Sequence, residues 1–389
     1  MNISRHSLIF GLSYALDILG KNNLSHSKST AYLSVQIAQE IGFKEDAILN
    51  IYYAALLHDI GISDEYTYKH SAVKNMKQHS VAGSHMLNKL PLPVEISKYI
   101  YYHHEYYNGS GAIGLSGEDI PKGAQIICLA SHFDDNFGKA KEFDKALITE
   151  INCWLDNNKM LFSKEIFDAF NSLINREYYL LDYFNLETKY VLSNKIVIHD
   201  DVNYSCEDVI KFALCFADII DNRSPFTFRH STGIAELARK AAKHLGCDDN
   251  TQQKMYIAGL LHDIGKLYVS TDILHKDGKL TPEERFEINK HTYYTRKVLE
   301  QIQGFEEIID YAANHHEKLD GTGYPYHIAG DNLSELEKVM AVCDVYQALT
   351  EERPYRKSLP SEKVWQIIDG MVDSKHLDKP VVEKLKQVF

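Results

Sequence analysis

Ten of the nineteen histidines in this 389-residue chain form two sets with the same spacing. In the C-terminal half, His230 precedes the pair His262-Asp263 by 32 positions, and His291 precedes the pair His315-His316 by 24. The same two intervals separate five histidines of the N-terminal half: His26, His58, His79, His103 and His104. Repeated spacings of this kind indicate a duplicated domain.

The C-terminal set offers five imidazoles and two carboxylates, a mixture that suits two divalent metal ions with one bridging carboxylate. The candidate ligands are His230, His262, Asp263, His291, His315, His316 and Asp344. Two ions about 3.5–4 Å apart lower the pKa of a bridging water and stabilise both oxygens of an in-line displacement. The predicted chemistry is therefore phosphoester hydrolysis by a metal-bridged hydroxide.

Several helices must position these ligands, as in the metal sites of helical bundles. Apolar residues at helical spacing follow His230, and Gly246 is expected to end that helix. Thr281-Pro282 predicts the start of the helix that carries His291, and Ser334 with Glu337 predicts the start of the one that carries Asp344. Gly265, in the repeated HDIG motif, is expected to terminate the helix that ends at the His-Asp pair.

Composition limits the remaining functions. The chain is 44% hydrophobic and 25% charged, as in ordinary globular proteins, and its net charge of −12 excludes long nucleic acid as a partner but leaves room for a small anion. The apolar stretch of residues 8–19 is short and contains Asp17, which argues against a signal peptide or membrane span and predicts a cytoplasmic protein. Six scattered cysteines make a disulfide framework improbable.

The C-terminal motifs resemble the HD superfamily of metal-dependent phosphohydrolases. Residues 315–325, HHEKLDGTGYP, are similar to the signature of its HD-GYP branch, and the resemblance covers residues 218–360, whereas the N-terminal half resembles only the parent HD domain. The resemblance implies an all-α fold of two tandem HD-type bundles, a di- or trinuclear metal centre and hydrolysis of cyclic dinucleotides. The substrate would be cyclic di-GMP, or 3′,3′-cyclic GMP-AMP as in some tandem relatives, and the product a linear dinucleotide or mononucleotide. The expected divisions are a degenerate HD domain at 1–185, a linker at 186–205 and an HD-GYP catalytic domain at 206–389.

The resemblance also implies roles for individual residues. One metal ion would be held by His230, His262, Asp263 and Asp344, and a second by Asp263, His291, His315 and His316. Lys266 would donate to a phosphate oxygen, and Gly323-Tyr324-Pro325 would form a lip where a signalling protein could also dock. Arg353 and Arg356 would contact phosphates or guanine edges, with ion pairing at a helix end as the alternative.

One departure concerns the number of ions. Relatives with three metals have a glutamate four residues before the first histidine, where this chain has Phe226. We therefore expect two ions, with iron or manganese favoured and zinc, nickel or magnesium as alternatives. Asp221 is the one nearby carboxylate that could approach by a different path.

The N-terminal copy has lost parts of the motif. Ser131 stands opposite Asp344, Ile62 opposite Lys266, and Gly111-Ala112-Ile113 opposite the GYP triplet. Asp59 and three histidines remain, so a single metal is conceivable, and Asp134, which matches Gln347, could compensate for the lost carboxylate. We predict a non-catalytic domain for regulation, nucleotide sensing or dimerisation. The alternative is that its histidines only support the fold.

Three functions stay open at this level. The first is a cyclic dinucleotide phosphodiesterase, the second a non-catalytic cyclic dinucleotide receptor or scaffold, and the third a hydrolase of another small phosphoester. The choice between the two dinucleotides, the metal identity and a homodimeric state are not determined by the sequence.

Overall fold

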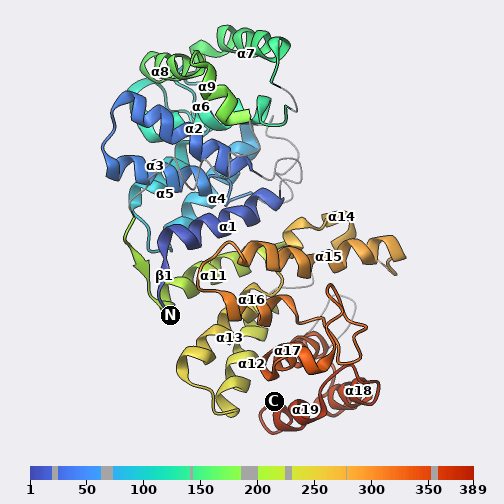
Figure 1. Ribbon diagram of the computed structural model, residues 1–389. Coiled ribbons are helices and arrows are strands. Elements are labelled where there is room, and N and C mark those ends of the chain that lie inside the picture. The colour runs from blue at the N-terminus through green and yellow to red at the C-terminus, as the bar shows by residue number, and fades with distance from the viewer. Residues whose placement is uncertain are drawn as a thin grey trace. The chain divides into compact units, whose positions relative to one another are not determined.

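Helices dominate the secondary structure of the described residues, which confirms the predicted all-α class (Figure 1). The computed structural model describes residues 1–19, 25–62, 73–140, 143–184, 200–223, 230–276, 278–351 and 358–389. Within these residues the strands are β1 (Ile3–Ser4) and β2 (Asn203–Tyr204), which pair antiparallel. Among the same residues, no helix is both long enough and apolar enough to cross a bilayer.

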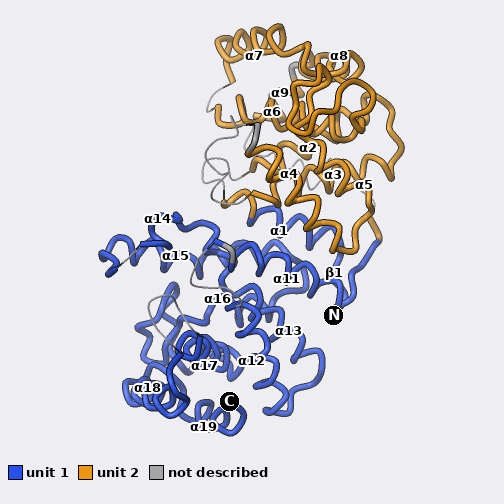
Figure 2. Tube along the Cα trace, turned by 180° about the vertical axis from the view of Figure 1, so that it is seen from behind, with its two compact units in different colours: residues 1–15, 202–389 blue, residues 16–201 orange. Residues whose placement is uncertain are grey.

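The chain divides into two compact units, residues 16–201 and residues 1–15 with 202–389 (Figure 2). The first fifteen residues thus group with the C-terminal unit, although the sequence assigned them to the N-terminal domain. Their β1 strand pairs with β2, and Arg5 N donates to Val202 O at 2.9 Å. The predicted linker 186–205 lies outside the described residues up to position 199.

The unit of residues 16–201 is a helical bundle that begins with the last turn of α1 (Arg5–Leu19). Its helices are α2 (His26–Ile41), α3 (Glu45–Leu57), α4 (Val73–Leu87), α5 (Val94–Tyr102), α6 (Lys122–Phe137), α7 (Lys145–Asn158), α8 (Lys164–Ile174) and α9 (Glu177–Phe184), with 3-10 turns η1 (Gly117–Asp119) and η2 (Lys159–Leu161). Helix α2 packs against α3, α6 and α8 and forms the centre of the bundle.

The C-terminal unit repeats this arrangement. Its helices are α11 (Cys206–Asn222), α12 (His230–His244), α13 (Asp249–Leu261), α14 (Thr271–Leu274), α15 (Pro282–Leu299), α16 (Glu306–Ala313), α17 (Glu335–Thr350), α18 (Ser361–Asp373) and α19 (Lys379–Leu385), with 3-10 turns η3 (Ile264–Tyr268) and η4 (Gly330–Asn332). Here α12 is central and packs against α13 and α17, as α2 packs against α3 and α6.

The predicted helix ends agree with the structure at three places. Thr281 and Glu284 form a reciprocal capping box at the start of α15, and Ser334 and Glu337 form one at the start of α17. Gly246 follows α12 with a φ of +79°, in the left-handed region that favours glycine. These local signals fix where the helices bearing His291 and Asp344 begin.

The predicted role of Gly265 as a helix terminator is wrong. Helix α13 already ends at Leu261, and Gly265 lies inside η3, which packs against α15. A Cβ on Gly265 would lie 1.9 Å from the carbonyl oxygen of His291, and one on Gly61 would lie 2.1 Å from that of His79. The glycine of each HDIG motif therefore permits contact between two backbone segments.

We expect Gly265→Ala to lower the free energy of unfolding by about 3 kcal/mol, because the methyl group must push η3 away from α15. Denaturant unfolding of the whole chain measures this loss. The matched control is Gly370→Ala in α18, where a Cβ meets nothing within 4 Å and removal of a helical glycine stabilises by up to about 1 kcal/mol. Equal effects of the two substitutions would contradict the packing argument.

Candidate metal centre

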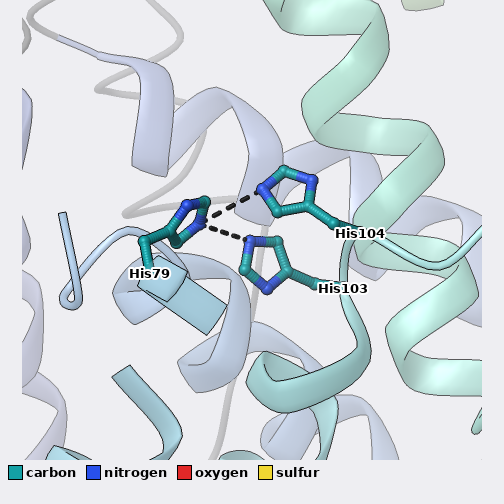
Figure 3. A group of neighbouring side chains, drawn as sticks. All are labelled: His79, His103 and His104. Carbon is teal, nitrogen blue, oxygen red and sulfur yellow. Dashed lines mark hydrogen bonds between the residues drawn. The ribbon is translucent and has the colours of Figure 1, made fainter. Parts of the chain in front are cut away.

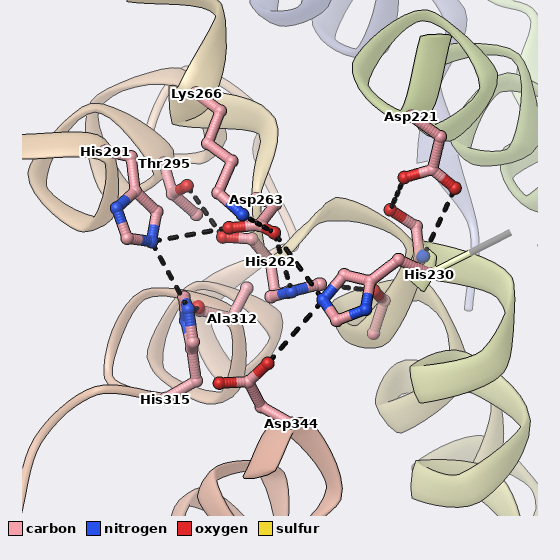
Figure 4. A network of polar contacts seen from close by, with 12 residues as sticks. Asp221, His230, His262, Asp263, Lys266, His291, Thr295, Ala312, His315 and Asp344 are labelled. Atoms are coloured by element: carbon pink, nitrogen blue, oxygen red, sulfur yellow. Dashed lines mark hydrogen bonds and ion pairs between the residues drawn. The ribbon is translucent and has the colours of Figure 1, made fainter. Parts of the chain in front are cut away.

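The seven candidate ligands of the C-terminal unit converge from different helices and turns, and Figure 4 labels all of them except His316. His230 is the first residue of α12, the pair His262-Asp263 follows α13, and Asp344 lies within α17. The ligand atoms form three overlapping groups, each within 4.8 Å: His230, His262 and Asp344; His262, Asp263 and His315; and His291, His315 and His316. The structure thus brings all seven into one cluster.

Three of the rings are held in one orientation by the backbone. Nδ1 of His262, His291 and His315 donates to the carbonyl oxygen three residues earlier, at 2.8, 2.7 and 2.6 Å. Because a carbonyl can only accept, the proton of each neutral ring lies on Nδ1 and the lone pair on Nε2. Nε2 atoms of His291 and His315 then face each other at 3.4 Å, an arrangement that a shared cation would stabilise.

Asp263 occupies the middle of the cluster. Its Oδ1 lies 3.3 Å from His291 Nε2, and its Oδ2 lies 3.1 Å from His262 Nε2 and accepts from Lys266 Nζ at 2.5 Å. Burial by itself raises the pKa of this carboxyl group, but the neighbouring His262 and Lys266 hold it well below its usual value. Asp263 is therefore a carboxylate.

Two buried atoms of the cluster fit metal ligands. Asp263 Oδ1 and His262 Nε2 have no hydrogen-bond partner among the described residues, although ionic groups stand near both. Buried polar atoms without hydrogen bonds are rare in folded proteins. Imidazole nitrogens and carboxylate oxygens that converge in this way suit divalent transition metals.

His230 is oriented by a residue that the sequence did not single out. Its Nδ1 donates to Glu351 Oε2 at 3.1 Å, while its Nε2 lies 3.6 Å from Asp344 Oδ1. Burial lowers the pKa of His230, but hydrogen bonds to Asp344 and Glu351 outweigh it and raise the value to about 9. Glu351 follows Asp344 by seven residues, two helical turns, and that spacing was the available signal.

The GYP lip lies beside the cluster because Glu317 fixes its loop. The buried Glu317 carboxylate accepts from the backbone nitrogens of Tyr326 and Ile328 at 2.8 and 3.0 Å. Gly323 is required by contact, since a Cβ there would lie 2.4 Å from Glu317 Cα. The ring centroid of Tyr324 is then 4.9 Å from that of His316. The glutamate after each histidine pair was visible in the sequence, but its role was missed.

Three residues considered with the site are not described, and a fourth has another role. Arg353, Arg356 and Phe226 fall outside the described residues. Asp221 supports the start of α12, where its two oxygens accept from the hydroxyl and backbone nitrogen of Ser231 at 2.7 and 3.2 Å. Its carboxylate is thus used next to His230 for hydrogen bonding within the fold.

The N-terminal copy keeps the same loop but not its side chains. A Cβ on Gly111 would lie 2.5 Å from Glu105 Cα, and Glu105 accepts from the backbone nitrogen of Gly114 at 2.8 Å, as Glu317 does from its own loop. Ala112 takes the place of the lip tyrosine. Ser131 is the tenth residue of α6, as Asp344 is of α17, so the predicted loss of that carboxylate agrees with the structure.

Comparison with known proteins agrees with this duplicated architecture. The model of the HD domain family matches residues 14–152 and 215–381, one segment in each half. The chain is 29% identical to 3′3′-cGAMP-specific phosphodiesterase 1 of Vibrio cholerae over 98% of this chain and 91% of that protein. It is 31% identical to 3′3′-cGAMP-specific phosphodiesterase 3 of V. cholerae over 74% of this chain and 62% of that protein. It is 41% identical to a cyclic di-GMP phosphodiesterase of Pseudomonas aeruginosa over 34% of this chain and 32% of that protein.

The crystal structure of the V. cholerae cyclic GMP-AMP-specific phosphodiesterase V-cGAP3 has the same fold. It superposes with a TM-score of 0.74 at 20% identity and covers 100% of this chain and 98% of that one. With the family model matched in both halves and a full-length structural counterpart, the chain belongs to the HD domain family.

Proposed function

We propose that the chain is a cyclic dinucleotide phosphodiesterase whose C-terminal unit carries out the hydrolysis. The observation that carries this proposal is the convergence of five histidines and Asp344 on the buried carboxylate of Asp263, with Lys266 in contact with it. The V. cholerae relative that aligns over 98% of this chain is named a phosphodiesterase, which supports the same reaction class.

Two divalent ions would fit the cluster. One would be held by His230, His262, Asp263 and Asp344, and the other by Asp263, His291, His315 and His316. When bound, such ions polarise phosphoryl oxygens and make a coordinated water more acidic. The imidazoles suit a divalent transition metal better than magnesium. We propose iron or manganese, with zinc, nickel or magnesium as the alternatives.

The chain's own residues supply orientation and charge. The Nδ1 hydrogen bonds hold the rings before any ligand binds, so little reorganisation is needed. Lys266 is 23% exposed whereas Asp263 is 3% exposed, so the ammonium lies on the accessible side of the cluster. There it would stabilise negative charge that develops on a phosphate oxygen. The ring of Tyr324 provides an apolar face beside His316 on which a base could stack.

The preferred substrate that we propose is 3′,3′-cyclic GMP-AMP rather than cyclic di-GMP. The relatives that align over 98% and 74% of the chain carry the first name, whereas the cyclic di-GMP phosphodiesterase of P. aeruginosa aligns over 34%. Binding of a signalling protein at the lip and formation of a homodimer remain predictions.

Removal of metal tests the proposal. We expect a chelated, metal-free chain to lose at least about 10³-fold of its hydrolysis rate on both dinucleotides, and anaerobic addition of Fe²⁺ or Mn²⁺ to restore it. Chromatography of the products, with metal counted per chain, measures both effects. A fully metallated chain that binds the dinucleotides but cleaves neither would exclude hydrolysis and favour the receptor function.

A further inference from the structure

Three histidines of the N-terminal unit still converge although this copy lacks counterparts of Lys266 and Asp344 (Figure 3). His79 Nε2 lies 3.0 Å from His103 Nε2 and 3.2 Å from His104 Nε2. His79 comes from α4, and the other two follow the end of α5. His79 and His103 are buried, so their shared position is imposed by packing.

The orientation of His103 is that of a metal ligand. Its Nδ1 donates to the carbonyl oxygen of Ile100 at 2.6 Å, as His315 does to Ala312 in the other copy, so its Nε2 faces the cluster as an acceptor. Neutral imidazole is the form that binds metals.

The distances also fit one ion. Nitrogens bound about 2.1 Å from a tetrahedral metal lie about 3.4 Å from one another, close to the separations of His79 from the other two rings. Asp59 adds a carboxylate, with its Oδ1 3.7 Å from His79 Nε2. The three imidazoles form one group of possible ligands, and we place Asp59 as the fourth ligand, although its carboxylate also groups with His26 and His58.

The other half of the N-terminal cluster is arranged differently. His26 Nδ1 donates to Asp134 Oδ2 at 2.6 Å, and its Nε2 lies 3.2 Å from His58 Nε2. Asp134 thus orients His26 from the outer side, as Glu351 orients His230, and does not replace the lost ligand at Ser131. Tyr183 holds the other oxygen of Asp134 through a hydrogen bond of 2.5 Å. Without a carboxylate at position 131, this half lacks the equivalent of Asp344.

We propose that the N-terminal unit binds a single divalent transition-metal ion through His79, His103, His104 and Asp59, and that this ion fastens α4 to the turn after α5 without hydrolysing a substrate. Ile62 occupies the position of Lys266, so no ammonium is available for a phosphate at that point. The site is independent of the reaction assigned to the C-terminal unit.

Binding of Co²⁺ to the full chain, stripped of metal and then dialysed to equilibrium, tests the site. We expect His104→Ala to bind about one Co²⁺ fewer per chain than the wild type. His104 is only partly buried, so its removal spares the core. The matched control is His85→Ala, an exposed histidine on α4, which should bind as many ions as the wild type. Equal Co²⁺ binding by the two variants would overturn the proposal.

A second measurement removes the other metals. In a chain carrying Asp263→Asn and His315→Ala, about one Co²⁺ should remain, and adding His104→Ala should abolish it. Chelation of that remaining ion should also lower the melting temperature of the chain. A folded double variant that binds no Co²⁺ would refute the site. If circular dichroism shows that the double variant does not fold, the comparison of His104→Ala with His85→Ala decides by itself.

Discussion

Replacement of Asp263 by asparagine is expected to lower kcat/KM for cyclic dinucleotide hydrolysis by about 10³-fold or more. The two oxygens of Asp263 face opposite halves of the cluster, one towards His291 and the other towards His262 and Lys266. Asparagine has nearly the same shape but no charge, and its amide group would present hydrogens to groups that now face an anion. The bridging position would thus be lost with little change in packing.

The experiment compares hydrolysis and metal content in the same preparations. Asp218→Asn is the matched control, because Asp218 is an exposed carboxylate on α11 and should leave both quantities unchanged. Loss of activity together with bound metal in the Asp263 variant supports the bridging role. An Asp263→Asn chain with full metal content and wild-type rate would show that the ligands are arranged around another residue.

Replacement of Lys266 by isoleucine, the residue of the N-terminal copy, is expected to lower kcat by about 10²-fold while the metal content stays the same. Lys266 is the cation in contact with Asp263 that is also accessible to a ligand. In the proposed role its charge would stabilise negative charge that develops during the reaction, so kcat should fall more than KM rises. Steady-state kinetics with metal counting measures both.

The control for this substitution is Lys243→Ile, at an exposed position of α12. It removes the same charge from the surface and should leave kcat unchanged. If Lys266→Ile instead lost its metal, Lys266 would act through the carboxylate of Asp263 and not through the substrate. A normal kcat with normal metal content would remove Lys266 from the mechanism.

The sequence by itself determined the duplication, the helical class and which residues gather in the C-terminal cluster. A metal site requires particular donor types, and the shared intervals of 32 and 24 residues reflect two copies of one helical arrangement. Helix caps could also be predicted, because the side chains of Thr281 and Ser334 accept hydrogen bonds from backbone N–H groups three residues later. Such information is local or is repeated along the chain.

Only the tertiary structure decided how distant segments support the cluster. Glu351 orients His230 across 121 residues, and Asp134 orients His26 across 108. In each copy a carboxylate thus holds the first histidine, but it comes from a different position along the helix. Gly265 is needed because its backbone lies against that of His291. The residues next to Gly265 in the sequence do not predict this contact.

The grouping of the first fifteen residues with the C-terminal unit was likewise beyond the sequence. It rests on pairing between Ile3–Ser4 and Asn203–Tyr204, strands of two residues that are too short to produce a periodic pattern. Metal-donor chemistry and local helix capping follow from the types of residues present. Strand pairing, the hydrogen bonds that orient the ligands and backbone contacts depend on which segments meet in space. That physical difference separates what could be predicted here from what had to be seen.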